Sequence, residues 1–272
     1  MSNRARLIPL LAVALIALFT YFNSEKFTNP ETGRTARVAL SPGQEAALGL
    51  QSYQQVLSES QVQNSGPDYE RVVRIARRLA QSTGDAGKNF QWAVSLVRSP
   101  QVNAFCLPGG KIVVYTGILP VAENDAQLAT VMGHEMAHAT SRHGSQRLLQ
   151  SKLTNELISS AQISISGMDP GQQQAIMGAI GAGAQYGLLL PFSREHESEA
   201  DYIGLLYMAR AGYDPREAIK FWQRMSQMAS AGQKPPEFAS THPSDATRIQ
   251  RLNDEMPKAI AEYEKSPYRN QN

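Results

Sequence analysis

The chain has 272 residues, of which 42% are hydrophobic and 18% are charged, and its net charge is +2 at pH 7. This composition indicates a globular protein with one sizeable core, and without a long basic run there is no reason to expect a nucleic-acid partner. The single cysteine, Cys106, leaves no disulfide within the chain and no cysteine cluster for a metal, so a metal site would have to use His, Glu and Asp.

At the N-terminus, Arg4 and Arg6 precede an apolar run over residues 7–22. This order is typical of an export signal, and no A-x-A-like cleavage site follows the run. We therefore expect residues 1–27 to form an uncleaved membrane anchor with its arginines in the cytoplasm. The prediction is an inner-membrane protein whose main domain lies on the periplasmic side. A soluble periplasmic protein, produced by signal cleavage, is the alternative.

Residues 28–40 mix proline, glycine and charged residues and are predicted to form a linker. A helix is then expected over residues 42–58, where Ser41 and Pro42 form a typical helix start. A second helix is expected over residues 67–82, where apolar residues recur at helical spacing. The arginines around that helix are interpreted as a solvated face rather than a phosphate or membrane site.

Three short strands are predicted next, over residues 90–97, 102–106 and 111–115. A small sheet of about three strands would then lie directly before the central helix, and the expected fold class is α+β and predominantly helical. The strand with Asn103, Ala104 and Phe105 could bind an extended peptide by backbone pairing. Alternatively, it is only a packing layer.

The central helix carries His134, Glu135 and His138 in an HExxH pattern. Histidines four apart lie above one another on one helix face, so both imidazoles can reach a single metal ion. Glu135 lies beside them, where it can act on a water molecule as a general base. Imidazole and carboxylate ligands suit zinc, and we expect one Zn²⁺ per chain. The alternative is an amphipathic helix with two incidental histidines.

Two histidines do not complete a metal site, and the downstream sequence offers two pairs of carboxylates. The metzincin pattern would require a histidine at position 144, where this chain has Gly144. Glu197 and Asp201 are four apart and share one helix face, so one could bind the metal while the other holds a ligating histidine. Glu195 and Glu199 form a competing pair on another face. Spacing alone does not choose between the pairs.

The remaining segments carry weaker signals. The glycine-rich, nearly uncharged stretch over residues 167–190 is interpreted as a hairpin that covers the site as a lid, with a second membrane span as the alternative. His143 is expected to bond locally after the central helix, and His196 is expected to be exposed. The last helix is expected over residues 244–255, because Pro257 should interrupt it.

The chain resembles peptidase family 48, the zinc metallopeptidases that include the CAAX prenyl endopeptidases, HtpX and BepA. The resemblance rests on HExxH at residues 134–138 and on a second motif about 60 residues later, in which the family's ExxxD pattern falls on Glu197 and Asp201. It extends over roughly residues 40–262 and includes the Asn-Ala-Phe segment and the His242-Pro243 pair. The chain resembles the compact members with a single anchor.

This resemblance implies a zincin-like core in which His134, His138 and Glu197 bind zinc. It implies further that Glu135 is the catalytic base and that Asp201 orients a ligating histidine. The implied activity is endoproteolysis, and the implied partners are polypeptide substrates, above all unfolded or mistargeted envelope proteins that are degraded in quality control.

His242 is a candidate to stabilise the oxyanion or to cap the open zinc position, and the alternative is a plain helix-entry residue. Two rival functions also stay open. One is a membrane-anchored, zinc-containing chaperone or binding protein with little proteolysis, which would have no need of a base at Glu135. The other is a hydrolase that acts on something other than peptides.

The expected domain organisation has four parts. They are an anchor over residues 1–27, a linker over 28–40, a metallopeptidase domain over 41–265 and a disordered tail over 266–272.

Overall fold

The computed structural model of the chain describes residues 15–165, 169–174, 193–230, 237–242 and 247–269. The contacts within it divide the chain into two compact units. Unit 1 comprises residues 1–28, 35–41 and 144–190, and unit 2 comprises residues 29–34, 42–143 and 191–272. All residues that the sequence suggests for a metal site belong to unit 2.

A four-stranded sheet lies in unit 2, with the strand order β3-β4-β6-β5. The strands are β3 (Val62–Gln63), β4 (Ala93–Val97), β5 (Ala104–Leu107) and β6 (Lys111–Tyr115). β5 and β6 form an antiparallel hairpin, whereas β4 runs parallel to β6. The three expected strands are therefore present. Strand β3 is a fourth, and its two residues are too few to show a strand pattern in the sequence.

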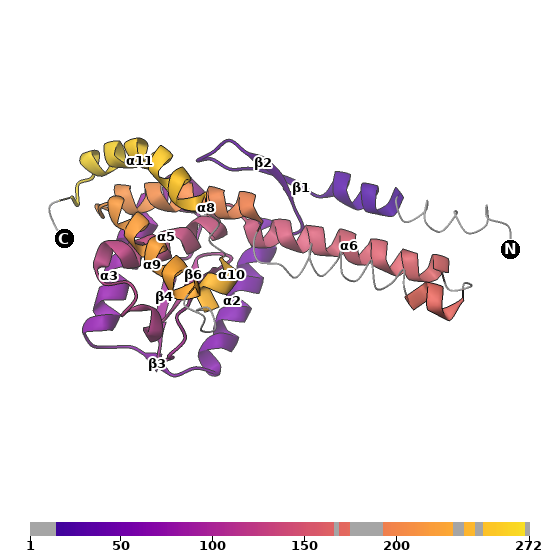
Figure 1. The fold of residues 1–272 in the computed structure, drawn as a ribbon, viewed down its shortest axis with the longest axis horizontal. Helices are drawn as coiled ribbons and strands as arrows, with labels where there is room; N and C mark the ends of the chain where they lie inside the picture. The colour runs from indigo at the N-terminus through magenta and orange to yellow at the C-terminus, as the bar shows by residue number, and fades with distance from the viewer. Residues whose placement is uncertain (1–14, 166–168, 175–192, 231–236, 243–246, 270–272) are drawn as a thin grey trace. The chain divides into compact units, whose positions relative to one another are not determined.

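The helices of unit 2 surround α5, which carries the HExxH residues and contacts α3, α8, α9 and strand β5 (Figure 1). Their bounds are α2 (Pro42–Ser58), α3 (Pro67–Ser82), α4 (Gly84–Gly87), η1 (Thr116–Ile118), α5 (Asp125–Thr140), α8 (Arg194–Arg210), α9 (Arg216–Ser230), α10 (Glu237–Thr241) and α11 (Arg248–Lys265). α2 and α3 span the residues predicted for them. From Gln127 to Thr140 every side chain of α5 is buried, because neighbours cover all its faces.

Two glycines let α5 and α8 cross with their backbones in contact. A Cβ atom added to Gly133 would lie 3.0 Å from the carbonyl oxygen of Gly204. A Cβ atom added to Gly204 would lie only 2.8 Å from the backbone nitrogen of His134. The close crossing therefore requires glycine on both helices, and it sets the distance between the side chains that the two helices carry.

We expect Gly204→Ala to lower the free energy of unfolding by about 1–3 kcal/mol, because the added methyl group must push α8 away from α5. Gly43→Ala is the matched control, since a Cβ atom there has no atom within 4 Å and Gly43 is also helical. Urea denaturation of both variants measures the difference. Equal stability of the Gly204→Ala variant and the parent would show that the crossing is not tight.

Helix α11 continues through Pro257 to Lys265, so the prediction that Pro257 interrupts it was wrong. Leu252, Met256 and Ala259 are buried on one face of the helix, on both sides of the exposed proline. Proline in a helix interior costs about 3 kcal/mol, and burying a large apolar side chain returns about 1.5–3 kcal/mol. The buried stripe therefore keeps the helix intact.

Unit 1 contains helical residues 15–23, the antiparallel pair β1 (Glu25–Thr28) and β2 (Thr35–Val38), and α6 (His143–Ile165) from its second residue onward. Arg37 in β2 donates hydrogen bonds to the carbonyl oxygens of Phe22 and Ser24, at 2.7 and 2.8 Å. The segment expected to be a linker thus includes a paired strand.

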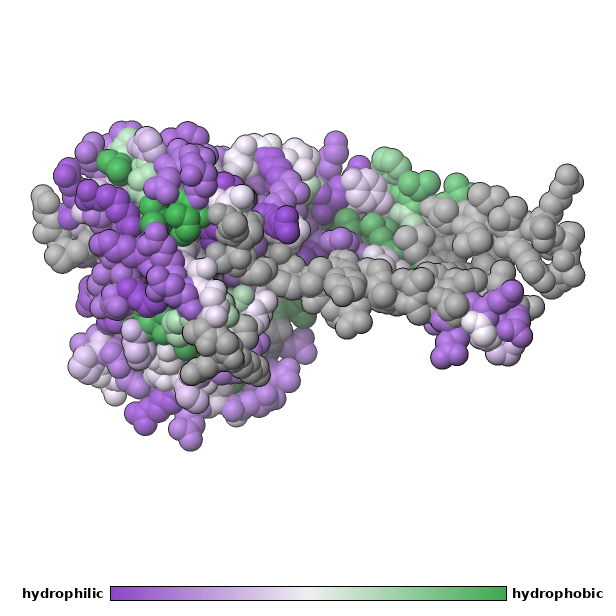
Figure 2. Space-filling view, viewed as in Figure 1, coloured by the Kyte–Doolittle hydropathy of each residue, from purple (hydrophilic) through white to green (hydrophobic). Residues whose placement is uncertain are grey.

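Apolar side chains lie exposed along helical residues 15–23, where they form a hydrophobic surface (Figure 2). None of the helices in the described part of the chain combines the length and the apolarity needed to cross a lipid bilayer. Residues 1–14 of the expected anchor lie outside the described residues. The same holds for most of the expected lid, residues 167–190.

Candidate metal centre

Helix α5 brings together the two histidines of the HExxH pattern. Its N-cap, Asn124, accepts a hydrogen bond from the backbone N–H of Gln127 at 2.9 Å, which fixes where the helix starts. His134 and His138 are 1% and 4% exposed, and their Nε2 atoms lie 3.1 Å apart. Both side chains therefore turn a ring nitrogen towards the same point.

Helix α8 brings a carboxylate group to that point. The helix begins after its N-cap, Ser193. The carboxylate oxygens of Glu197 lie 3.4 Å from Nε2 of His134 and 3.4 Å from Nε2 of His138. One turn further along, Oδ1 of Asp201 lies 3.0 Å from Nδ1 of His134. Of the two pairs that spacing allowed, Glu197 and Asp201 are the pair that faces the histidines of the HExxH pattern.

His242, which follows α10, joins the same cluster. Its Nδ1 lies 3.2 Å from Nε2 of His134 and 3.0 Å from Oε1 of Glu197. His134, His138, Glu197 and His242 each offer one ligand atom, and these atoms all lie within 4.8 Å of one another. The structure thus brings together the three residues expected to bind a metal and the histidine expected beside them.

The spacing of these atoms fits a tetrahedral zinc ion. Bonds of about 2.0–2.1 Å from zinc to nitrogen or oxygen place neighbouring ligand atoms about 3.3 Å apart in a tetrahedron. The histidine nitrogens lie 3.1 and 3.2 Å from their neighbours in the cluster, the two oxygens of Glu197 lie 3.0–3.4 Å from histidine nitrogens, and one ligand atom from each of the four residues lies within 4.8 Å of the other three. Imidazole nitrogens with a carboxylate oxygen are also donors that suit zinc. The side chains present therefore fit the metal that the HExxH pattern implies.

Glu135 lies beside the cluster and is 3% exposed. Its Oε1 lies 3.3 Å from Nε2 of His242 and accepts no hydrogen bond from the described residues. Burial raises the pKa of this carboxyl group, and the neighbouring His242 and His134 oppose the rise. A buried carboxylate with an available oxygen and a raised pKa is suited to exchanging a proton with a reacting group.

The electrostatics of the cluster favour a bound cation. Burial would raise the pKa of Glu197, but hydrogen bonds from the surrounding histidines hold it far below its usual range, so the carboxylate is ionised. Burial would lower the pKa of His134, but its contacts with Asp201 and Glu197 outweigh burial and raise this pKa to about 9. For His138 burial prevails, and its pKa lies well below the usual value.

Arg248 links the two carboxylates of α8 and was not identified as part of the site from the sequence. Its Nη2 donates to Oε2 of Glu197 and its Nε donates to Oδ2 of Asp201, both at 2.6 Å. The guanidinium carbon lies 3.8 Å from the ring centroid of Trp222, and Arg248 is 1% exposed. This buried cation therefore balances the negative charge of the two buried carboxylates.

The expectation that His196 is exposed was wrong. This residue is 8% exposed, and its ring stacks on that of His143 with the centroids 4.3 Å apart. His196 shares one face of α8 with Ala200 and Ile203, both fully buried. The stripe at positions 196, 200 and 203 was the signal in the sequence that could have indicated burial.

Strand β5, which carries two of the residues expected to bind a peptide, lies at the edge of the sheet and contacts α5. Ala104 is buried in the core, and the ring of Phe105 packs edge-on against Tyr115 with the centroids 6.0 Å apart. Asn103 precedes the strand, and its side-chain oxygen accepts a hydrogen bond from the N–H of Ala104 at 2.9 Å. A peptide at this edge would therefore contact the backbone more than these side chains.

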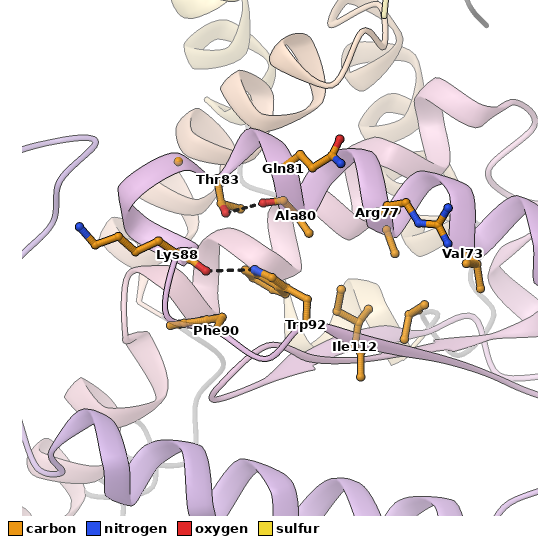
Figure 3. A pocket seen from close by; sticks show the side chains of 14 residues that line it. Val73, Arg77, Ala80, Gln81, Thr83, Lys88, Phe90, Trp92 and Ile112 are labelled. Atoms are coloured by element: carbon orange, nitrogen blue, oxygen red, sulfur yellow. Dashed lines mark hydrogen bonds between the residues drawn. The ribbon is translucent and has the colours of Figure 1, made fainter.

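A separate cavity of about 530 Å³ lies between α3, α4 and the start of β4 (Figure 3). Its wall includes Trp92, whose Nε1 donates to the carbonyl oxygen of Gly87 at 3.2 Å. None of the histidines or carboxylates of the metal cluster lines it. The cavity is therefore not part of the site formed by the HExxH residues.

Comparison with known proteins adds an independent finding. The sequence model described as peptidase family M48 matches residues 68–256. The mitochondrial metalloendopeptidase OMA1 of Schizosaccharomyces pombe is 34% identical over 227 residues, which are 82% of this chain and 64% of that protein. The mitochondrial metalloendopeptidase OMA1 of Saccharomyces cerevisiae is 32% identical over 266 residues, which are 92% of this chain and 74% of that protein.

A bacterial relative is similar over most of the chain. The Beta-barrel assembly-enhancing protease of Escherichia coli strain K12 is 27% identical over 263 residues, which are 92% of this chain and 53% of that protein. The chain thus spans about half to three quarters of the length of these relatives. The family match covers more than half of the chain and includes both the HExxH residues and the pair Glu197 and Asp201. The family expected from the motifs is confirmed, and the chain belongs to peptidase family M48.

Proposed function

We propose that this chain is a zinc-dependent endopeptidase that cleaves polypeptides. The observation that carries the proposal is the buried cluster of His134, His138 and Glu197, whose ligand atoms lie close enough to share one ion, next to the available oxygen of Glu135. In this proposal these three residues bind zinc, and Asp201 orients His134 through its Nδ1. Membership of peptidase family M48 and the relatives named metalloendopeptidases support the same activity.

The mechanism assigns proton transfer to Glu135. Zinc, when bound, supplies Lewis-acid polarisation of the scissile carbonyl and activation of water at neutral pH. Glu135 takes the proton from the attacking water and delivers it to the leaving amine, for which its raised pKa suits it. The backbone of Cys106 in β5 lies close enough to Glu135 to lower its pKa, so a peptide paired along β5 would lie next to the general base.

Of the two roles considered for His242, the geometry favours the capping role. Its Nδ1 is as close to His134 and Glu197 as the proposed ligands are to each other, so it can occupy the remaining ligand position while no substrate is bound. Its Nε2 then points to Glu135. A substrate would have to displace this ring, after which the imidazole could donate to the oxyanion.

Metal removal tests the proposed activity. We expect cleavage of casein by the full chain to be lost on treatment with 1,10-phenanthroline and restored by about one equivalent of zinc, because Glu135 alone does not polarise the scissile carbonyl or lower the pKa of the water. The non-chelating isomer 1,7-phenanthroline is the matched control. Full proteolysis by protein that has been shown to be metal-free would contradict the proposal. A metal-loaded protein that suppresses aggregation without cleaving casein would instead favour the binding-protein alternative.

We expect the affinity for zinc to rise about tenfold for each pH unit between pH 7 and pH 9. Without metal, the pKa of His134 is about 9, so below that pH zinc must displace a proton from this ring. The same raised pKa stabilises the metal-free fold below pH 6.5, and this contribution is lost as the pH rises through about 9. Competition with a chelator of known affinity measures the slope, and a flat affinity from pH 7 to pH 9 would contradict it.

The location and the substrates belong to the same proposal. The chain would act in the cell envelope, attached to the membrane through its N-terminal segment, and would degrade unfolded or mistargeted proteins. The arginines before the apolar run and the exposed apolar side chains of residues 15–22 support attachment. Cell fractionation of the full chain and of a variant lacking residues 2–22 tests it. If both proteins are recovered in the soluble fraction, the N-terminal segment is not an anchor.

A further inference from the structure

A buried hydrogen-bonded chain leads away from the proposed ligand His138 on the side opposite the metal cluster. Nδ1 of His138 lies 2.9 Å from Nδ1 of His143, and Nε2 of His143 lies 2.9 Å from Oε2 of Glu199. His143 is 0% exposed and Glu199 is 7% exposed, so water does not compete for these groups. Neither His143 nor Glu199 has a part in the mechanism proposed above.

The chemistry of the three groups fixes the direction of each hydrogen bond. An ionised carboxylate can only accept, so Nε2 of His143 must carry the proton that it shares with Glu199. In the neutral imidazole the other nitrogen is then an acceptor, so Nδ1 of His143 takes a hydrogen bond from Nδ1–H of His138. His138 is thereby left with its lone pair on Nε2, the atom that faces the cluster. The opposite tautomer of His138 would place a proton there and could not bind a metal.

Glu199 is held in place by a segment far away in the sequence. Oε1 of Glu199 accepts from Nδ2 of Asn29 at 3.1 Å and from the hydroxyl of Thr32 at 2.7 Å. Oε2 accepts from Nε of Arg34 at 2.8 Å. These three residues lie in the segment 29–34, outside the part of the chain that matches the family, and the segment packs in unit 2.

The other histidine of the motif shows the simpler form of the same arrangement. Nδ1 of His134 faces the carboxylate of Asp201 directly, at 3.0 Å. At His138 the ring of His143 stands between the ligand and Glu199. Each histidine of the HExxH pattern is thus backed by a carboxylate, one directly and the other through a second imidazole.

We infer that His143 and Glu199 are positioning residues that set the tautomer and the ring orientation of His138, and that the segment 29–34 completes this support. The inference rests on the proposed function in that it takes His138 to be a zinc ligand. It adds that the metal site extends beyond the family match and depends on Arg34 and its neighbours. Support of this kind typically changes metal affinity by about 10–100-fold when it is removed.

Zinc affinity of the full chain, measured by chelator competition, tests the inference without requiring proteolysis. We expect His143→Leu to weaken zinc binding by about 10–100-fold, because the acceptor for Nδ1–H of His138 is lost. We expect His143→Asn to retain most of the affinity, because its amide oxygen can reach the position of Nδ1 and accept the same bond. Equal affinities of the Leu variant and the parent would overturn the inference, and so would equal losses in the Leu and Asn variants.

The segment 29–34 supplies a matched pair of variants. Arg34→Met removes the cation that holds Glu199, and we expect it to weaken zinc binding about tenfold. Glu31→Gln is the control, because Glu31 lies in the same segment but pairs with Arg210, at 2.7 Å, and not with Glu199. A loss of zinc affinity in Glu31→Gln that equals the loss in Arg34→Met would overturn the role of Arg34, since the segment would then act only through its folding.

The tautomers can also be measured in the unaltered protein, which keeps the inference testable if a variant does not fold. Nitrogen-15 NMR of the zinc-loaded chain should show His143 protonated on Nε2 and not on Nδ1, and His138 protonated on Nδ1. A proton on Nδ1 of His143 would overturn the inference. If zinc binds with these tautomers but casein is not cleaved, the positioning role holds and the proposed endopeptidase activity fails, so the two failures are distinguishable.

Discussion

Glu135→Gln is expected to lower the rate of casein cleavage by about 10²–10⁴-fold while the protein stays folded and keeps its zinc. The amide has nearly the shape of the carboxylate but cannot take a proton from water. Glu135 is not among the side chains that converge on the metal cluster, so zinc content should not change. Parallel measurement of casein cleavage and of bound zinc tests both parts of this prediction.

Glu195→Gln is the matched control for this experiment. Glu195 is an exposed glutamate in the first turn of α8, two residues before Glu197, and the change removes the same charge. We expect the control to cleave casein at the rate of the parent protein. Proteolysis by Glu135→Gln within about twofold of the parent, with zinc retained, would remove Glu135 from the mechanism and leave the general base unassigned.

The second large effect is expected for stability. Arg248→Met should lower the free energy of unfolding by about 3–5 kcal/mol, because it leaves two buried carboxylates without their common cation. Arg248 is 1% exposed and donates to both Glu197 and Asp201, so water cannot replace it. The change also removes the contact of the guanidinium with Trp222. Urea denaturation of zinc-loaded protein measures the loss.

Lys258→Met is the control, because it removes a positive charge from the same helix. Lys258 lies on α11, like Arg248, but its side chain is 66% exposed and pairs with Glu255 at the surface. An exposed pair of this kind contributes little to stability, because water and salt screen it, so the control should be nearly as stable as the parent. If Arg248→Met costs no more than Lys258→Met, the buried carboxylates do not depend on Arg248 for compensation.

The contacts of the segment 29–34 within unit 2 bear on the choice of a fragment for measurement. The match to the family begins at residue 68, yet Asn29 and Arg34 contact Glu199, which lies between Glu197 and Asp201 of the second motif. A protein shortened to residues 68–256 would keep the HExxH pattern and Glu197 but would lose these contacts. We therefore expect such a fragment to be less active than the full chain.

The sequence by itself determined the helical core and the residues worth examining. Residues 42–58 and 67–82 form helices as expected, because the first begins at a typical helix start and the second has apolar residues at helical spacing. The spacing of His134 and His138 places both rings on one face of α5 in any helical conformation. This placement follows from the geometry of a single helix, so it can be predicted without knowledge of tertiary contacts.

Spacing left open which carboxylates of α8 face the histidines; the family resemblance assigned Glu197 and Asp201, and only the tertiary structure supplies the physical reason. Glu195 and Glu197 are equally good candidates from spacing, but the crossing of α8 over α5 at Gly204 and Gly133 turns Glu197 and Asp201 towards the histidines. The same crossing leaves Glu195 exposed. The orientation of a helix about its axis depends on packing with a distant segment, and no local pattern encodes it.

Long-range pairing explains what the sequence did not reveal. His143, Glu199 and Arg34 lie far apart in the chain, and each has an ordinary local context, so nothing marked them as partners. The prediction for Pro257 was wrong for the same reason. The sequence shows that proline destabilises a helix, but only the fold shows that the apolar face of α11 is buried. Charges and prolines are tolerated where folding supplies a partner or buried area, and that compensation exists only in three dimensions.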